Sequence, residues 1–138
     1  MSSIHDAALT ALAAGRAKAR ELEMPSTYAI VDAGGNLVAF LRDEAAGLAT
    51  IEIARAKAYT AVALRSPSGD WMDLVQPSAA LYGLEQLGGR ERLVVFGGGL
   101  PVFVDGRLVA GVGVSGGPVD IDVAIARSMV ESLCAAGA

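Results

Sequence analysis

A predicted strand in the last third of the chain has two very different faces, and this contrast limits what the whole chain can fold into. Successive side chains of a β-strand point to opposite sides, so the stretch from Leu108 to Ser115 places an alanine and two valines on one face and Gly111 and Gly113 on the other. The first face is typical of a hydrophobic core. Glycine inside a strand costs roughly 0.5–1 kcal/mol relative to alanine. The second, nearly bare face therefore indicates close packing by either an alanine-rich helix or a flat ligand.

The chain before this strand reads as a helix, a hairpin and a second helix. Helical spacing predicts the first helix over Asp6–Met24, which Pro25 ends. Two strand-like runs separated by a glycine-containing turn predict a hairpin over Thr27–Arg42. Helical spacing returns over Thr50–Leu64, with the threonine as N-cap. This second helix carries a narrow stripe of small residues, so it is the natural candidate to cover the glycine face.

Glycine and proline divide the second half of the chain into shorter pieces. The region from Ser66 to Gly89 is interrupted by several of them, which favours single helical turns over long elements. A proline at the first helical position and an acidic residue in the first turn indicate where the last helix begins. The expected elements are helical turns near Asp70–Leu74 and Ala79–Leu87, short strands between Leu93 and Ser115 with a hairpin turn at Asp105-Gly106, and a helix from Pro118 to about Ala135.

The composition favours one ordered domain that forms oligomers. The 138 residues contain no linker or repeat, so we expect a single domain over residues 1–138. With 53% hydrophobic residues, the chain has more apolar surface than a small monomer can bury, which predicts a homo-oligomer. A net charge of -4 without a basic run argues against a nucleic-acid partner. The longest apolar run, Leu93–Val104, is shorter than the ~20 residues that span a bilayer, so we expect no membrane insertion.

The single cysteine and single histidine restrict the possible chemistry. Cys134 has no partner for an intrachain disulfide, and with His5 alone it cannot form a zinc site. The common Ser-His-Asp and Cys-His schemes of nucleophilic catalysis are excluded away from His5. The apolar N-terminal stretch follows Asp6 and has no basic residue before it, so we expect no signal peptide and a cytoplasmic protein.

Five blocks of the sequence occur in the order and spacing of one known family. They are VDAGGNLVAFLR, IEIARAKAYTA, VQPSAALYGL, VVFGGGLPV and GVGVSGGPVDID. Together, from about Thr10 to Leu133, they resemble the GlcG/HbpS-like family, which includes heme-binding proteins and the C-terminal domain of PduO-type corrinoid adenosyltransferases. The resemblance implies an α+β fold, with a five-stranded antiparallel sheet flanked by helices, similar to profilin and roadblock domains. It also implies homo-oligomers, from dimers to octamers.

The resemblance makes heme the candidate cofactor, and a heme site needs an axial ligand to its iron, usually histidine. Many members of the family carry histidine where this chain has Asn36. His5 is thus the candidate metal ligand: it is either an exposed terminal residue or an iron ligand in its own or a neighbouring subunit. Tyr28, Tyr59, Tyr82 and the methionines could also bind iron, but each fits simple packing as well.

The start of the last helix is a candidate anion site. Ser115, Gly116 and Gly117 precede it, and the unpaired N–H groups at a helix N-terminus carry partial positive charge. Two interpretations stay open: a tight turn that joins strand to helix, or a site for a carboxylate or propionate. The same stretch matches the G-x-G-x-x-G pattern of dinucleotide-binding proteins, but too few residues follow it to form the next parallel strand.

Three charged side chains, Glu52, Lys57 and Asp122, are the candidates for catalysis. Lys57 is either a solvated charge or, beside Gly97–Gly99, a group that holds an anionic substrate while backbone amides stabilise an oxyanion. Glu52 lies on another face of the same helix. Asp122 is either a favourable charge for the helix dipole or a general acid or base, because a carboxylate beside a dry pocket can have a raised pKa.

Two functional hypotheses follow. The first is a small-molecule-binding protein for heme or another planar cofactor, with a pocket beside the glycine-rich strand. The second is an enzyme without a cofactor, such as an isomerase, tautomerase or hydratase that acts on a small carboxylate or carbonyl compound. The positions that would contact a cofactor are Asn36, Gly97, Gly98, Gly99, Pro101, Gly113, Ser115 and Gly116.

Overall fold

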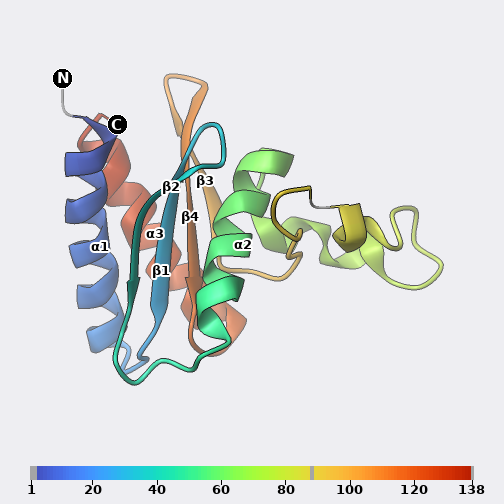
Figure 1. Ribbon diagram of the computed structural model, residues 1–138, viewed down its shortest axis with the longest axis horizontal. Coiled ribbons are helices and arrows are strands. Elements are labelled where there is room, and N and C mark those ends of the chain that lie inside the picture. The colour runs from blue at the N-terminus through green and yellow to red at the C-terminus, as the bar shows by residue number, and fades with distance from the viewer. Residues whose placement is uncertain (1–2, 88, 138) are drawn as a thin grey trace.

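The centre of the molecule is a four-stranded antiparallel sheet with the strand order β2-β1-β4-β3 (Figure 1). The computed structural model describes residues 3–87 and 89–137. Two helices, α1 and α3, cover one face of the sheet, and α2 covers the other. The elements in chain order are α1 (Ile4–Glu21), β1 (Thr27–Asp32), β2 (Leu37–Arg42), α2 (Thr50–Leu64), the 3-10 helices η1 (Ser68–Val75) and η2 (Leu84–Leu87), β3 (Gly99–Val104), β4 (Arg107–Ser115) and α3 (Val119–Ala135).

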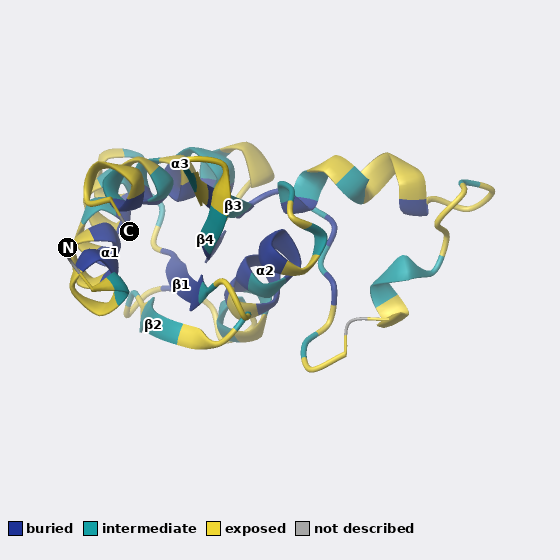
Figure 2. Cartoon of the chain, turned by 90° about the horizontal axis from the view of Figure 1, so that it is seen from above, coloured by how far each residue is buried: buried dark blue, intermediate teal, exposed yellow. Residues whose placement is uncertain are grey.

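The main core lies between the sheet and the helices α1 and α3. The apolar face of β4, with Ala110, Val112 and Val114 completely buried, packs into this core, as its alternation predicted. Met129 and Leu133 of α3 are buried against it. In Figure 2 the buried residues gather along the inner sides of the helices and in the central strands. This arrangement leaves the other face of β4 for α2.

The glycine face of β4 is covered by α2, so the helix and not a ligand occupies it. A Cβ at Gly111 would lie 2.7 Å from the carbonyl oxygen of Ala58, and one at Gly113 would lie 2.6 Å from the amide nitrogen of the same residue. Ala54, one turn earlier on α2, is completely buried against the same face. The two glycines therefore allow backbone-to-backbone packing, and the space beside this strand is closed.

Both predicted hairpins form, because each has suitable turn chemistry. Between β1 and β2, the carboxylate of Asp32 accepts hydrogen bonds from the backbone N–H groups of Gly34, at 2.9 Å, and Asn36, at 3.0 Å. Between β3 and β4, Asp105 and Gly106 have φ angles of +52° and +77°. Positive φ at both central residues is typical of the turns that match the twist of paired strands.

The sheet has four strands, so the expectation of five is wrong. Residues 93–98 are irregular chain: side chains satisfy part of their backbone, and the contact with β4 is made at Gly98, whose carbonyl accepts from the N–H of Val114 at 2.9 Å. The N–H of Val94 donates to Thr60 Oγ1 at 2.8 Å, and the carbonyl of Phe96 accepts from Ser68 Oγ at 2.8 Å. The α+β class stands, and the likeness to profilin and roadblock domains stays a prediction.

Two predicted helix starts are wrong by one residue. Thr50 is the first residue of α2 and not its N-cap, since the cap position is Ala49, which makes no side-chain bond. The Thr50 hydroxyl instead donates to the carbonyl of Gly47. Pro118 occupies the N-cap position of α3, with an extended backbone, and the helix begins at Val119.

Residues 66–87 form an arm that projects away from the sheet (Figure 1). Its first helical turn, η1, confirms the expectation near residues 70–74, whereas only Leu84–Leu87 of the second predicted piece is helical. Several of its large apolar side chains are exposed: Met72, Leu74, Leu81, Tyr82 and Leu87. Among the described residues, none of the helices combines the length and hydropathy that crossing a bilayer requires.

Candidate functional site

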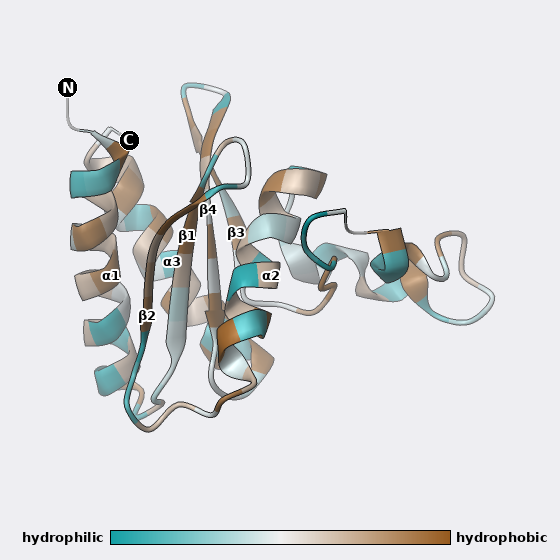
Figure 3. Cartoon of the chain, in the orientation of Figure 1, coloured by the Kyte–Doolittle hydropathy of each residue, from teal (hydrophilic) through white to brown (hydrophobic). Residues whose placement is uncertain are grey.

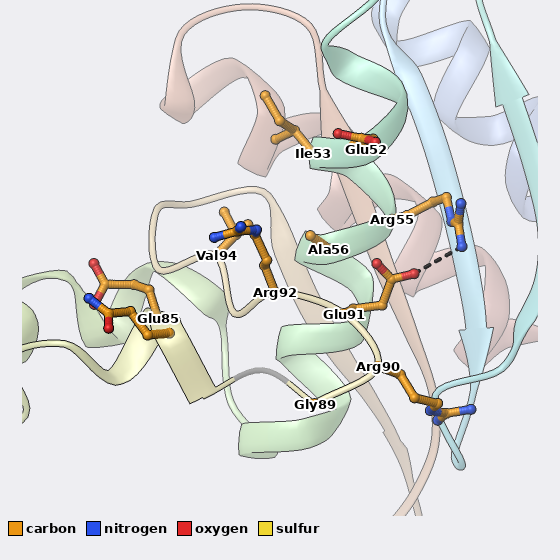
Figure 4. Close-up of a pocket in the computed structure, with 11 residues that line it drawn as sticks. Glu52, Ile53, Arg55, Ala56, Glu85, Gly89, Arg90, Glu91, Arg92 and Val94 are labelled. Atoms are coloured by element: carbon orange, nitrogen blue, oxygen red, sulfur yellow. Dashed lines mark hydrogen bonds and ion pairs between the residues drawn. The ribbon is translucent and has the colours of Figure 1, made fainter.

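A cavity of about 750 Å³ lies between the outward face of α2 and a wall formed by residues 85, 86, 89–92 and 94 (Figure 4). Pockets for small molecules and cofactors are commonly about 300–1,000 Å³. The helix presents this face because its inward alanines are fixed against β4. The lining residues are Glu52, Ile53, Arg55, Ala56, Glu85, Gln86, Gly89, Arg90, Glu91, Arg92 and Val94.

The lining combines apolar side chains with three arginines and three glutamates. Arg55 Nη2 lies 2.9 Å from Glu91 Oε1, which ties α2 to the segment that follows the arm. Arg90 Nη1 donates to Asn36 Oδ1 at 2.8 Å, and its guanidinium lies 5.7 Å from the centre of the Tyr59 ring. Arg92 is exposed at the cavity and has no ion pair within the described residues. The arginines and glutamates of the lining are equal in number, so Arg92 is the place where positive charge stands open to a ligand beside apolar surface.

A second cavity of about 320 Å³ adjoins the first one and shares Arg55, Arg90 and Glu91 with it. It lies against the β1–β2 turn. Asn36, predicted to contact a cofactor, lines this second cavity together with Tyr59. Of the predicted cofactor-binding positions, this is the one that the structure brings to either cavity.

Lys57 and Asp122 form an ion pair inside the molecule, with Nζ 3.0 Å from Oδ2 and side chains only 1% and 3% exposed. Lys57 also donates to the carbonyl of Val114 at 2.8 Å and lies 5.2 Å from the centre of the Phe96 ring. Burial lowers the pKa of Lys57 and raises the pKa of Asp122, while their mutual attraction opposes both changes. The interpretation of Lys57 as a solvated charge is therefore wrong.

The three candidates for catalysis do not share one site. Glu52 lines the first cavity, whereas Lys57 and Asp122 are buried away from both cavities. The Lys57 side chain does lie beside the glycine run that follows Phe96, as expected. A Cβ built at Gly98 would be 2.6 Å from Lys57 Nζ. The anion that it holds there is the chain's own Asp122. This geometry gives no support to the enzyme hypothesis.

The predicted anion site at the start of α3 is also filled by Asp122. Its Oδ1 accepts a hydrogen bond of 3.2 Å from the N–H of Gly117. A backbone hydrogen bond from Gly116 also stabilises the charged carboxylate. A Cβ at Gly116 would lie 2.6 Å from the carbonyl oxygen of Pro25. Together with the buried Ser115, this segment is a tight, closely packed turn.

The remaining glycine positions are also occupied by neighbouring atoms. A Cβ at Gly97 would lie 2.6 Å from Val119 Cγ1, and Gly99 lies between Ser68 and the backbone of Lys57. Pro101 is paired with Gly111 in the sheet. None of these positions lines the two cavities described above.

The candidate iron ligands are scattered. His5 is exposed on α1, on the opposite side of the sheet from α2 (Figure 1). Tyr28 is completely buried and donates to Asp43 Oδ2 at 2.6 Å; burial and this carboxylate raise its pKa well above the usual value. Tyr59 lines the second cavity, and Tyr82 lies exposed on the arm. Within the described residues, no cluster of three or more His, Cys, Asp or Glu could hold a metal ion.

Four charged residues of the lining were not among the predicted site residues and carry much of its charge: Arg55, Arg90, Glu91 and Arg92. A signal existed for three of them. The charged run Arg90-Glu91-Arg92 follows Gly89 and directly precedes an apolar stretch, so three consecutive charges stand at the edge of a hydrophobic region. The sequence around Arg55 gives no such signal. Charged and small residues alternate along α2, and this pattern fits an ordinary solvent-exposed helix face as well as it fits a cavity wall.

Comparisons with known proteins show which sequences this chain resembles. It is 44% identical over 115 residues to an uncharacterized 15.0 kDa protein from the dhaT-dhaS intergenic region of Citrobacter freundii, covering 83% of this chain and 80% of that protein. It is 42% identical over 117 residues to the corrinoid adenosyltransferase PduO of Salmonella typhimurium, covering 84% of this chain. That match covers 34% of PduO, so this chain corresponds to about a third of the enzyme.

Solved structures share the fold over nearly the whole chain. The protein ORFY of Klebsiella pneumoniae is 35% identical, with a TM-score of 0.90 over 95% of this chain and 90% of that one. A PduOC:heme complex is 39% identical, with a TM-score of 0.86 over 96% of this chain and 94% of that one. Residues 4–131 match the family model described as haem degrading protein HbpS-like. The chain therefore belongs to the HbpS-like family.

Proposed function

We propose that the protein binds heme, or a closely similar carboxylated tetrapyrrole, in the cavity on the outward face of α2. The observation that carries this proposal is a cavity of about 750 Å³ in which Arg92, exposed and without an ion pair among the described residues, lies beside the apolar side chains of Ile53 and Val94. Heme has the matching chemistry, since it joins a flat apolar ring to two carboxylates. The similarity to the PduOC:heme complex supports the same ligand class.

The residues of the cavity fit the body and the carboxylates of heme better than they fit its iron. Ile53, Ala56 and Val94 offer apolar contact to a ring, and Arg92 can bind a propionate. No histidine, cysteine, methionine or tyrosine is among the lining residues that the structure describes, and the nearest candidate, Tyr59, belongs to the adjoining cavity. Bound heme would supply a redox-active iron; the chain would supply carboxylate binding and apolar contact for one face of the ring.

Titration with hemin tests this proposal. Wild-type protein should give a saturable change in the Soret band, and Arg92→Gln should weaken binding about five- to tenfold, because a charge-assisted hydrogen bond to a propionate is lost. His5→Ala is the matched control: this exposed residue lies across the sheet, so its affinity should equal that of wild type. Absence of a saturable spectral change would refute the proposed function, and a large loss in His5→Ala would place the iron elsewhere.

We also propose that the protein assembles into homo-oligomers through the β2 edge of the sheet. Within the described residues β2 is an edge strand, and its hydrophobic side chains are half-buried or exposed; Figure 3 shows the strand as strongly hydrophobic. Leu37 is 48% exposed. Such an apolar edge favours pairing with a second copy. Native mass spectrometry should give a multiple of 14.0 kDa, and Leu37→Lys, at the exposed position of this edge, should lower the subunit number. A wild-type protein that stays monomeric at micromolar concentration would contradict this proposal.

A further inference from the structure

A single ion pair lies in the wall between the two cavities. Arg55, Arg90 and Glu91 line both of them, and the short contact across this wall joins Arg55 Nη2 to Glu91 Oε1 at 2.9 Å. The two side chains are 43% and 30% exposed, so solvent reaches the pair. Figure 4 shows it as a bridge from α2 to the segment after the arm. Opening this pair would connect the two cavities.

The two arginines of this wall are held differently. Arg90 is fixed on the side of the β1–β2 turn by Asn36 Oδ1 and by the carbonyl of Gly34, and it stacks over Tyr59. These partners are neutral, and a ligand carboxylate could add to them without replacing any. Arg55, in contrast, already binds a carboxylate. A ligand that needs Arg55 must therefore compete with Glu91.

We propose that Glu91 holds the place of a ligand carboxylate on Arg55, and that a carboxylated ligand displaces it and joins the two cavities into one longer site. The inference rests on the proposed function and explains its ligand specificity. The site would select ligands that can place a carboxylate on Arg55. The exchange conserves the type of interaction, because one carboxylate replaces another on the same guanidinium. A half-exposed ion pair changes an equilibrium by no more than about fivefold, so the displaced pair is weak enough to open.

The test compares hemin with its dimethyl ester, which lacks the carboxylates. Glu91→Gln removes the competing charge, so it should bind hemin about three- to fivefold tighter than wild type and bind the ester with unchanged affinity. The matched control is Glu131→Gln, which makes the same charge change at an exposed position on α3 and should leave both affinities unchanged. An equal gain for hemin and for the ester, or a gain in the control, would overturn the inference.

Arg55→Gln separates the exchange from a general effect on folding. This variant should bind hemin about fivefold more weakly, and Glu91→Gln added to it should bring no gain, because the two residues act through one contact. If wild type binds hemin and Glu91→Gln does not improve it, the inference fails while the proposed function stands. If neither wild type nor Glu91→Gln binds hemin, the proposed function fails as well.

Discussion

Replacement of Lys57 by methionine should lower the free energy of unfolding by about 3–5 kcal/mol, the cost typical of removing one partner from a buried ion pair. Methionine is close to lysine in volume, so the loss comes from charge and not from a void. The Asp122 carboxylate would stay in the core, 3% exposed, with no cation beside it. Urea unfolding of wild type and variant measures the difference.

Two further variants separate charge from packing. Lys18→Met removes a lysine from a surface pair with Glu21, 3.4 Å apart, and should cost less than about 0.5 kcal/mol. In the double variant Lys57→Met/Asp122→Leu both charges leave the core together, and part of the lost stability should return; the N–H of Gly117 and the carbonyl of Val114 still lose their partners. A double variant that is less stable than Lys57→Met would contradict the explanation by an unpaired charge.

The Lys57→Met variant should also respond to pH with a definite sign. Burial raises the pKa of Asp122, and without Lys57 the attraction that opposes this rise is gone. A carboxyl group with a higher pKa in the folded state stabilises the fold when protonated. The destabilisation should therefore be smallest below the ordinary carboxyl pKa of about 3.9 and grow as the pH rises through the folded pKa. A larger loss at about pH 4 than at about pH 7 would be the contrary result.

Replacement of Gly113 by alanine should cost about 3 kcal/mol, at the upper end of the range for overpacking. The added Cβ would lie 2.6 Å from the amide nitrogen of Ala58 and closer still to the carbonyl oxygen of Ala54. Both atoms belong to the backbone of α2, so no side-chain rotation can relieve the contact. The helix must move off the sheet, and hemin binding should weaken too, because the outward face of α2 forms the cavity wall.

Gly47→Ala is the matched control for this prediction. A Cβ at Gly47 would have nothing within 4 Å, and its φ lies outside the left-handed region. The substitution should leave the stability unchanged or raise it slightly, since alanine restricts the unfolded chain. Thermal unfolding of the two variants, followed by circular dichroism, gives the comparison. A Gly113→Ala variant as stable as Gly47→Ala would mean that α2 can shift without cost.

The sequence allowed prediction of the parts of the fold that depend on local patterns. The two faces of β4 follow from alternation, and the hairpins follow from turn residues such as Asp32 and Asp105. The irregular course of residues 93–98 could not be predicted in this way, because its backbone partners are distant in sequence. Thr60, for example, is 34 residues from Val94. When such distant partners are not known, the apolar pattern of residues 93–98 predicts another strand.

The candidate site was harder to predict for the same reason. Lys57 and Asp122 are 65 residues apart, and nothing in the local sequence of either shows that they neutralise each other. Arg90 reaches Asn36 across 54 residues and so brings the β1–β2 turn to the cavity. Charges that look alike in the sequence therefore take opposite roles, since one pair is sealed in the core and other charged residues line an open cavity.

The close fit of α2 on the glycine strand has a consequence for how a ligand could be accommodated. One wall of the cavity belongs to α2. This helix cannot move closer to the sheet, because its backbone already contacts the glycines of β4, and moving away would expose its buried alanines. Residues 89–94 on the other wall contain neither helix nor strand. A change of shape on ligand binding would therefore fall on residues 89–94, where it has to break side-chain contacts such as Arg55–Glu91, and not on α2.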